Sequence, residues 1–150
     1  RGFRVELVSG GMPLATEVPP GINIHQLPPT RSPDASFSRL LDANGNVVDD
    51  AWRNSRRTQL LDLFDRLSPQ VLITETFPFG RRMMRFELIP LLERARDSAH
   101  CLQVIASIRD ILQPKSKPGR NEEICELVTG FYDHVLVHGD PSFSSLDDRF

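Results

Sequence analysis

Short apolar runs alternate with longer amphipathic segments along this chain of 150 residues. Each run is typical of a β-strand, whereas apolar positions spaced three, four and seven residues apart predict helices. The expected strands cover residues 4–9, 22–27, 71–73, 102–108 and 134–137. The expected helices cover residues 50–67, 84–95 and 121–131. This order predicts a single α/β domain over residues 1–150, Rossmann-like, with a largely parallel sheet, right-handed crossovers and helices on both faces.

The first expected strand begins only four residues into the chain and follows Gly2. A glycine before a strand is typical of the end of a helix-to-strand connection. We therefore expect a first strand, its loop and a first helix to precede Arg1, so that the chain is part of a larger protein. The missing strand is expected to be a central one, so its loss would leave an unpaired sheet interior through which the fragment could self-associate or swap.

Arginines gather at the start of the second expected helix. Arg81, Arg82 and Arg85 stand where the helix macrodipole disfavours cations that have no anionic partner. Their partner is expected to be either an internal carboxylate, Glu75 or Glu87, or the phosphate or carboxylate group of a ligand.

Capping and breaking residues set the expected bounds of the helices. Asp49 or Asp50 is expected to cap the first helix, and Asn121 is expected to cap the third. Pro90 would remove a hydrogen bond from the second helix. That helix is therefore expected either to kink at the proline or to begin near Glu87.

Three groups of polar residues are assigned structural roles. The Asn-Gly pair at residues 44–45 predicts a turn between two apolar pairs within a long connection. His25 lies in the middle of an expected strand and is predicted to be a hydrogen-bonded structural histidine. Arg53, Arg56 and Arg57 on the first helix are expected to form a solvated face without a function.

The overall charge disfavours two classes of partner. A net charge of -2 gives no basic surface for nucleic acid or for an anionic membrane. No apolar run is long enough for a transmembrane helix, and residues 1–4 do not have the pattern of a signal peptide. Cys101 and Cys125 fit neither a disulfide framework nor a metal site, so reduced thiols and a cytoplasmic location are expected.

Glycine, proline or ionisable residues follow every expected strand. The carboxyl ends of parallel strands meet at one edge of a sheet, where open α/β folds bind their ligands. Two residues at this edge, Glu75 and His138, are candidate catalytic bases. Arginine forks suit phosphate and carboxylate groups, and glycines allow the backbone to approach a ligand. The candidate substrate-binding residues are Gly10, Gly11, Arg81, Arg82, Arg109 and Asp110.

Other interpretations of this edge stay open. Asp110 would also serve to cap a turn at residues 111–112, and Arg109 could simply hold loops together. The mixture of arginines and carboxylates suits a sugar or a sugar phosphate. The chain has no phosphate-cradling loop, no GxGxxG fingerprint and no pair of metal ligands at helical spacing, so no cofactor is expected.

Seven segments of the chain together carry a family resemblance: VSGGMP, QLPP, ETFPFGRR, MRFELIPLLE, SIRDIL, KPGR and VHGDP. They resemble the N-terminal half of a bacterial family of predicted glycosyltransferases with the two-domain GT-B fold. That family is similar to the peptidoglycan N-acetylglucosaminyltransferase of the lipid II pathway. The resemblance implies that this chain is most of the acceptor-side domain and lacks its first strand, its first helix and the donor domain.

The resemblance also implies a reaction, which is transfer of a sugar from a nucleotide-sugar donor to an unknown sugar or lipid-linked acceptor without a tightly bound metal. Related enzymes often place a catalytic base in the loop expected before Arg1, so the fragment alone should be inactive. Two alternatives stay open: hydrolysis or epimerisation of a nucleotide sugar on the same scaffold, and a non-enzymatic α/β module that binds a partner through this edge or through the face of Arg53, Arg56 and Arg57. A reading frame that encoded only these residues would favour the binding module.

Overall fold

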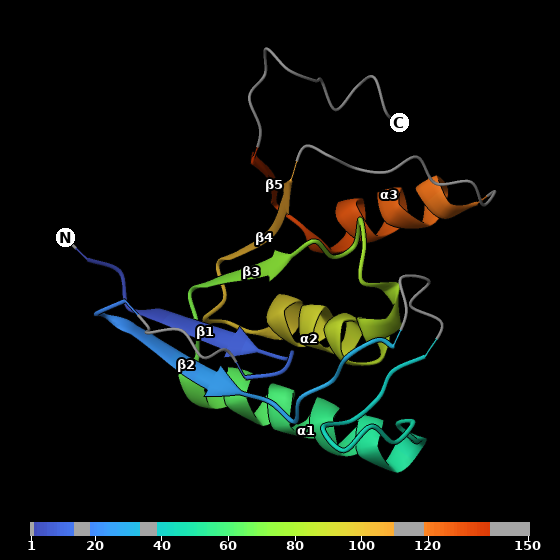
Figure 1. Ribbon diagram of the computed structural model, residues 1–150. Coiled ribbons are helices and arrows are strands. Elements are labelled where there is room, and N and C mark those ends of the chain that lie inside the picture. Colours follow the sequence, from blue (N-terminus) through green and yellow to red (C-terminus); the bar gives the residue numbers. More distant parts are fainter. Residues whose placement is uncertain (1, 14–18, 34–38, 110–118, 139–150) are drawn as a thin grey trace. The chain divides into compact units, whose positions relative to one another are not determined.

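The computed structural model describes residues 2–13, 19–33, 39–109 and 119–138 (Figure 1). Its strands pair in parallel within two small sheets flanked by helices, which confirms the predicted α/β class. The chain divides into two compact units, residues 1–62 and 63–150, and each unit has its own sheet.

The first unit is built on two parallel strands. β1 (Val5–Ser9) pairs with β2 (Ile22–Gln26) along the full length of both strands. In the connection that follows β2, Leu41 forms antiparallel bridges with Arg31 and Val47. The turn predicted at residues 44–45 is confirmed there, with Gly45 at a φ of 86° that glycine adopts without steric cost.

His25 is a structural histidine, as the sequence predicts. Its Nε2 lies 2.7 Å from the Glu6 carboxylate, on the neighbouring strand. The hydrogen bond with His25, followed by that from the Asn23 amide, lowers the pKa of Glu6 below its usual value. The imidazole is therefore engaged in holding the two strands together.

The long helix α1 (Asp50–Leu67) begins in the first unit and ends in the second. Asp49 caps it, because its carboxylate accepts a hydrogen bond from the backbone N–H of Trp52 at 2.8 Å. This contact settles the choice between the two aspartates at the predicted cap.

The solvated arginine face predicted on α1 is wrong for Arg56. Its side chain is 1% exposed, and its guanidinium donates to the carbonyl of Gly10 at 3.0 Å and to the carbonyl of Pro28. The guanidinium carbon also lies 5.5 Å from the centre of the Trp52 ring. Residues 52, 56 and 60 repeat every four positions, so Arg56 shares a helix face with the buried Leu60.

The second unit holds a three-stranded parallel sheet in the order β3-β4-β5 (Figure 1). Its strands are β3 (Val71–Glu75), β4 (Gln103–Arg109) and β5 (His134–His138). Its helical segments are a 3₁₀ turn (Arg82–Met84), α2 (Arg85–Asp97) and α3 (Arg120–Phe131). α2 and α3 contact each other, as expected when right-handed crossovers between successive neighbouring strands lie on one side of a sheet.

The two faces of this sheet differ in burial. The side chains buried on one face are Thr74, Val104, Ala106 and Ile108. Buried side chains of α2 and α3 complete the core of the unit: Leu91, Leu92, Ala95 and Ile124. On the opposite face the apolar side chains of Val71, Ile73 and Leu136 are exposed.

Three details differ from the sequence predictions. The single sheet is formed as two sheets, which share no strand pair within the described residues, because a periodic pattern identifies strands without identifying their partners. Asn121 does not cap α3, since the helix begins at Arg120 behind Gly119, whose φ is 76°. α2 begins at Arg85, before Glu87, and continues through Pro90.

Candidate functional site

The strand register brings four polar side chains to the carboxyl edge of the β3-β4-β5 sheet. Glu75 pairs in register with Ser107, and Arg109 pairs with His138. Ser107 and Arg109 are two residues apart on β4, so side-chain alternation places them on the same face. The predicted site residues Glu75, Arg109 and His138 therefore come together, on the face opposite the buried core.

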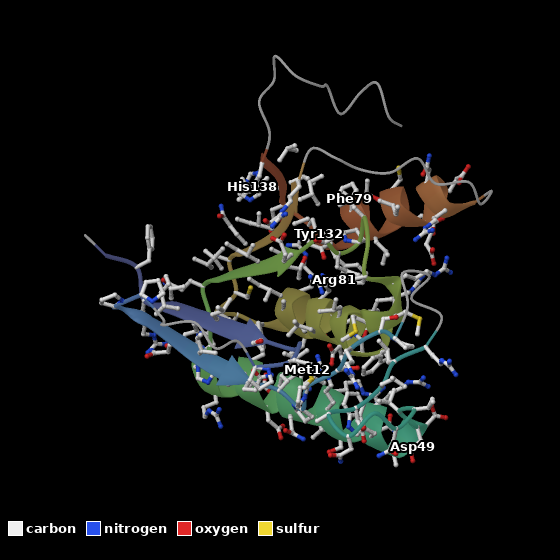
Figure 2. The ribbon with its side chains drawn as sticks, in the orientation of Figure 1. Met12, Asp49, Phe79, Arg81, Tyr132 and His138 are labelled. Carbon is white, nitrogen blue, oxygen red and sulfur yellow. The ribbon has the colours of Figure 1, made fainter. Side chains whose placement is uncertain are left out.

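Ser107 links the two predicted catalytic bases. Its hydroxyl donates to Glu75 Oε2 at 2.8 Å and lies 2.9 Å from His138 Nε2. Ser107 is only 6% exposed, whereas Glu75 and His138 are both exposed to solvent. Figure 2 labels His138 at the carboxyl end of β5. We call these three hydrogen-bonded side chains the Glu75–Ser107–His138 group.

The sequence patterns do not single out Ser107, because it lies within the apolar run LQVIASI. The signal that the sequence does offer is the position of this serine relative to the end of the strand. A polar residue two positions before a charged residue at a strand exit points to the same face as that residue. Ser107 stands in this relation to Arg109, and a search for such pairs would have found it.

The loop after β3 is held next to this group by backbone contacts. The N–H of Thr76 donates to the carbonyl of Ser107 at 2.7 Å. Thr76 has a φ of 70°, an unfavourable left-handed conformation for a β-branched residue. A Cβ on Gly80 would lie 2.7 Å from the Thr76 methyl carbon, so the loop requires glycine there. Such strained positions cluster at ligand sites, which supports a functional role for this edge.

Two buried hydroxyl groups, those of Thr74 and Tyr132, hold the same loop on the buried side of the sheet. Thr74 Oγ1 donates to the carbonyl of Phe77 at 3.0 Å and lies 2.9 Å from the hydroxyl of Tyr132. Burial raises the pKa of Tyr132 to about 12, while the hydrogen bond with Thr74 acts in the opposite direction. The buried rings of Phe77 and Phe79 complete the anchor, and Figure 2 labels Phe79 and Tyr132.

The arginines at the start of α2 fall into two classes. Arg82 and Arg85 both form ion pairs with Glu123 of α3, at 3.3 Å for Arg82. Their internal carboxylate is therefore one that the sequence prediction did not name. Arg81, labelled in Figure 2, is exposed in a left-handed conformation with a φ of 51°. Within the described residues its side chain has no hydrogen bond or ion pair, so it is available to an anionic ligand.

Gly10 and Gly11 belong to the first unit. A Cβ on Gly10 would collide with the Arg56 guanidinium, so close packing accounts for this glycine. The carbonyl of Gly11 accepts a hydrogen bond from the Gln26 side chain at 2.9 Å. The predicted ligand contacts of both glycines stay predictions, and Asp110 lies outside the described residues.

The described chain contains no ready-made metal site. Nowhere in residues 2–13, 19–33, 39–109 and 119–138 do three His, Cys, Asp or Glu side chains gather around a common point. The Glu75–Ser107–His138 group would offer a cation one carboxylate and one imidazole. Over the same ranges, every helix is too short or too polar to cross a bilayer.

Comparisons of the chain with protein-family models, with curated proteins and with solved structures find no match. A function for the carboxyl edge therefore has to be proposed from the chemistry of its residues and from the resemblance of the seven segments.

Proposed function

We propose that the carboxyl edge of the second unit binds the sugar acceptor of a glycosyltransferase that uses a nucleotide-sugar donor. One observation carries this proposal: Glu75 and His138 lie on strands that are not neighbours, yet both contact Ser107. A carboxylate and an imidazole held side by side accept hydrogen bonds from hydroxyl groups, of which a sugar has several. The resemblance of the seven segments to GT-B glycosyltransferases supplies the reaction class.

Glu75 is the proposed base at this edge. As the acceptor hydroxyl oxygen attacks the anomeric carbon of the donor sugar, its proton passes to the Glu75 carboxylate. The new C–O bond forms while the bond to the nucleotide diphosphate breaks, and the diphosphate leaves with the electron pair. In this proposal the exposed Arg81 and Arg109 hold anionic groups of the substrates, whereas Arg82 forms an ion pair with Glu123.

The test measures release of nucleoside diphosphate by the full-length gene product from a panel of nucleotide sugars, with and without hydroxylated acceptors. We expect release to require an acceptor. Glu75→Gln should lower kcat by about 100- to 10,000-fold, the range typical for loss of a general base. Glu93→Gln is the matched control, because Glu93 is an exposed glutamate on α2.

Two results would contradict the proposal. Release of nucleoside diphosphate at the same rate without any acceptor would favour a hydrolase or an epimerase on this scaffold. A kcat that Glu75→Gln and Glu93→Gln leave equally unchanged would remove the carboxyl edge from the reaction.

The arginines of α1 give little support to the alternative of a non-enzymatic binding module. Arg56 is buried, and Arg53 forms an ion pair with Asp50 at 2.9 Å. The Arg57 guanidinium donates to the Asn54 side chain at 3.0 Å. A partner would therefore meet a helix face whose cations already have contacts within the chain.

A further inference from the structure

Ser107 has one hydroxyl proton and two hydrogen-bonding neighbours. Its oxygen lies 2.8 Å from Glu75 Oε2 and 2.9 Å from His138 Nε2. An ionised carboxylate can only accept a hydrogen bond, so the Ser107 proton points to Glu75. The contact between Ser107 and His138 then requires a proton on Nε2, which the imidazole donates to the serine oxygen.

This direction is the opposite of that in a hydrolase with an activated serine. A nucleophilic serine gives its proton to the histidine, whose Nε2 must be unprotonated to accept it. Here the serine O–H donates its hydrogen bond to the neighbouring carboxylate and keeps its proton. Ser107 is also 6% exposed, so its oxygen is poorly placed to attack a substrate.

We propose that Ser107 is a positioning residue, which orients Glu75 and holds His138 in the form that carries its proton on Nε2. Among the residues that the structure describes, Glu75 Oε1 and, in the neutral imidazole, His138 Nδ1 then have no hydrogen-bond partner and can accept from a ligand. Since both atoms accept, this point of the edge binds hydroxyl donors in preference to a phosphate group. The preference for hydroxyl donors rests on the proposed function, whereas the direction of the two hydrogen bonds does not.

Nitrogen NMR of the protein labelled with ¹⁵N-histidine tests the direction of these bonds. The chain has four histidines, and the protonated nitrogen of a neutral imidazole is identified by its chemical shift. We expect His138 to carry its proton on Nε2 and that proton to be protected from solvent exchange. His134 is the internal control, because it lies exposed on the same strand and the described chain gives its side chain no hydrogen bond.

Two variants separate positioning from general packing. Ser107→Ala should accelerate exchange of the Nε2 proton of His138 by about tenfold, the factor that one net hydrogen bond is worth. Ser107→Thr keeps a hydroxyl, and its branched side chain suits a strand, so protection of the proton should be retained. If Ser107→Ala fails to fold, the wild-type protein and Ser107→Thr still give the answer.

Three results would overturn the proposal. The first is a wild-type His138 with its proton on Nδ1, which would mean that Ser107 donates to the imidazole. The second is covalent labelling of Ser107 by a sulfonyl fluoride, which would identify a nucleophile. The third is unchanged protection of the proton in Ser107→Ala. None of these measurements requires sugar transfer, so they fail or succeed independently of the kcat test of Glu75→Gln.

Discussion

At the scale of single residues, Arg56 joins segments that are distant in the sequence. Its guanidinium donates to the carbonyls of Gly10 and Pro28, which follow β1 and β2 respectively. A buried cation is tolerated only where such partners replace the water it has lost. Arg56 therefore stabilises the exits of both strands in the first unit.

Replacing Arg56 should show this contribution. Arg56→Met keeps an apolar side chain of similar reach but removes a charged donor from two carbonyls, so we expect the free energy of unfolding to fall by about 1–3 kcal/mol. Arg53→Met is the control, since the exposed ion pair of Arg53 with Asp50 should contribute about 0.5 kcal/mol or less. Urea denaturation measures both changes, and equal losses would contradict a special role for Arg56.

A second prediction at the residue scale concerns Tyr132 at alkaline pH. The chain has one tyrosine, and burial raises its pKa from 10.0 to about 12. The folded state therefore disfavours tyrosinate, so this group's stabilisation is complete below pH 10 and is lost as the pH rises towards 12. Ultraviolet titration should detect tyrosinate only near that upper pH or on unfolding.

The matched variant for this titration is Tyr132→Phe. It should lower the free energy of unfolding at neutral pH by about 0.5–1.5 kcal/mol, because the hydrogen bond between Tyr132 and Thr74 is lost. It should also remove the alkaline dependence that this group causes. Tyrosinate that formed near pH 10 in the folded wild type would show that the hydroxyl is not buried.

At the scale of secondary-structure elements, Asp133 ties the start of one strand to a helix and to a second strand. Its carboxylate accepts from the N–H of Val104 on β4 at 2.7 Å and from Arg96 of α2 at 3.0 Å. The hydrogen bond from Val104 lowers the pKa of Asp133, and Arg96 lowers it further. The residue itself directly precedes β5, so one carboxylate connects three elements of the second unit.

Acid unfolding should report this connection. A lowered pKa in the folded state means that the stabilisation is present above the unfolded pKa, about 3.9, and is lost as the pH falls through the folded value. Asp133→Asn should therefore lower the melting temperature at pH 7, and its difference from the wild type should shrink below about pH 4. Asp97→Asn, which changes an exposed aspartate of α2, should show no such convergence.

At the scale of the whole molecule, the sequence predicts local features well and long-range pairing poorly. The strands, the helices and the meeting of Glu75, Arg109 and His138 follow from periodicity and from the general geometry of parallel sheets. The division into two sheets does not follow, because strand pairing depends on contacts between distant residues.

The wrong prediction for Arg56 and the absence of any prediction for Ser107 have a common physical cause. From residue type alone, an arginine is expected to be exposed to solvent. A serine within an apolar run does not stand out as a functional residue. In the structure, backbone carbonyls compensate the buried arginine, and a carboxylate and an imidazole both contact the serine. In each case the partners come from other elements, which a single stretch of sequence does not reveal.

In the loop that follows Glu75, the residue type at position 76 restricts the residue type at position 80. The methyl group of Thr76 fills the space that any side chain on Gly80 would need. A relative of this protein with alanine at position 80 would therefore be expected to carry at position 76 a residue without that methyl group, such as glycine, alanine or serine. We therefore expect substitutions at positions 76 and 80 to occur together among relatives of this protein.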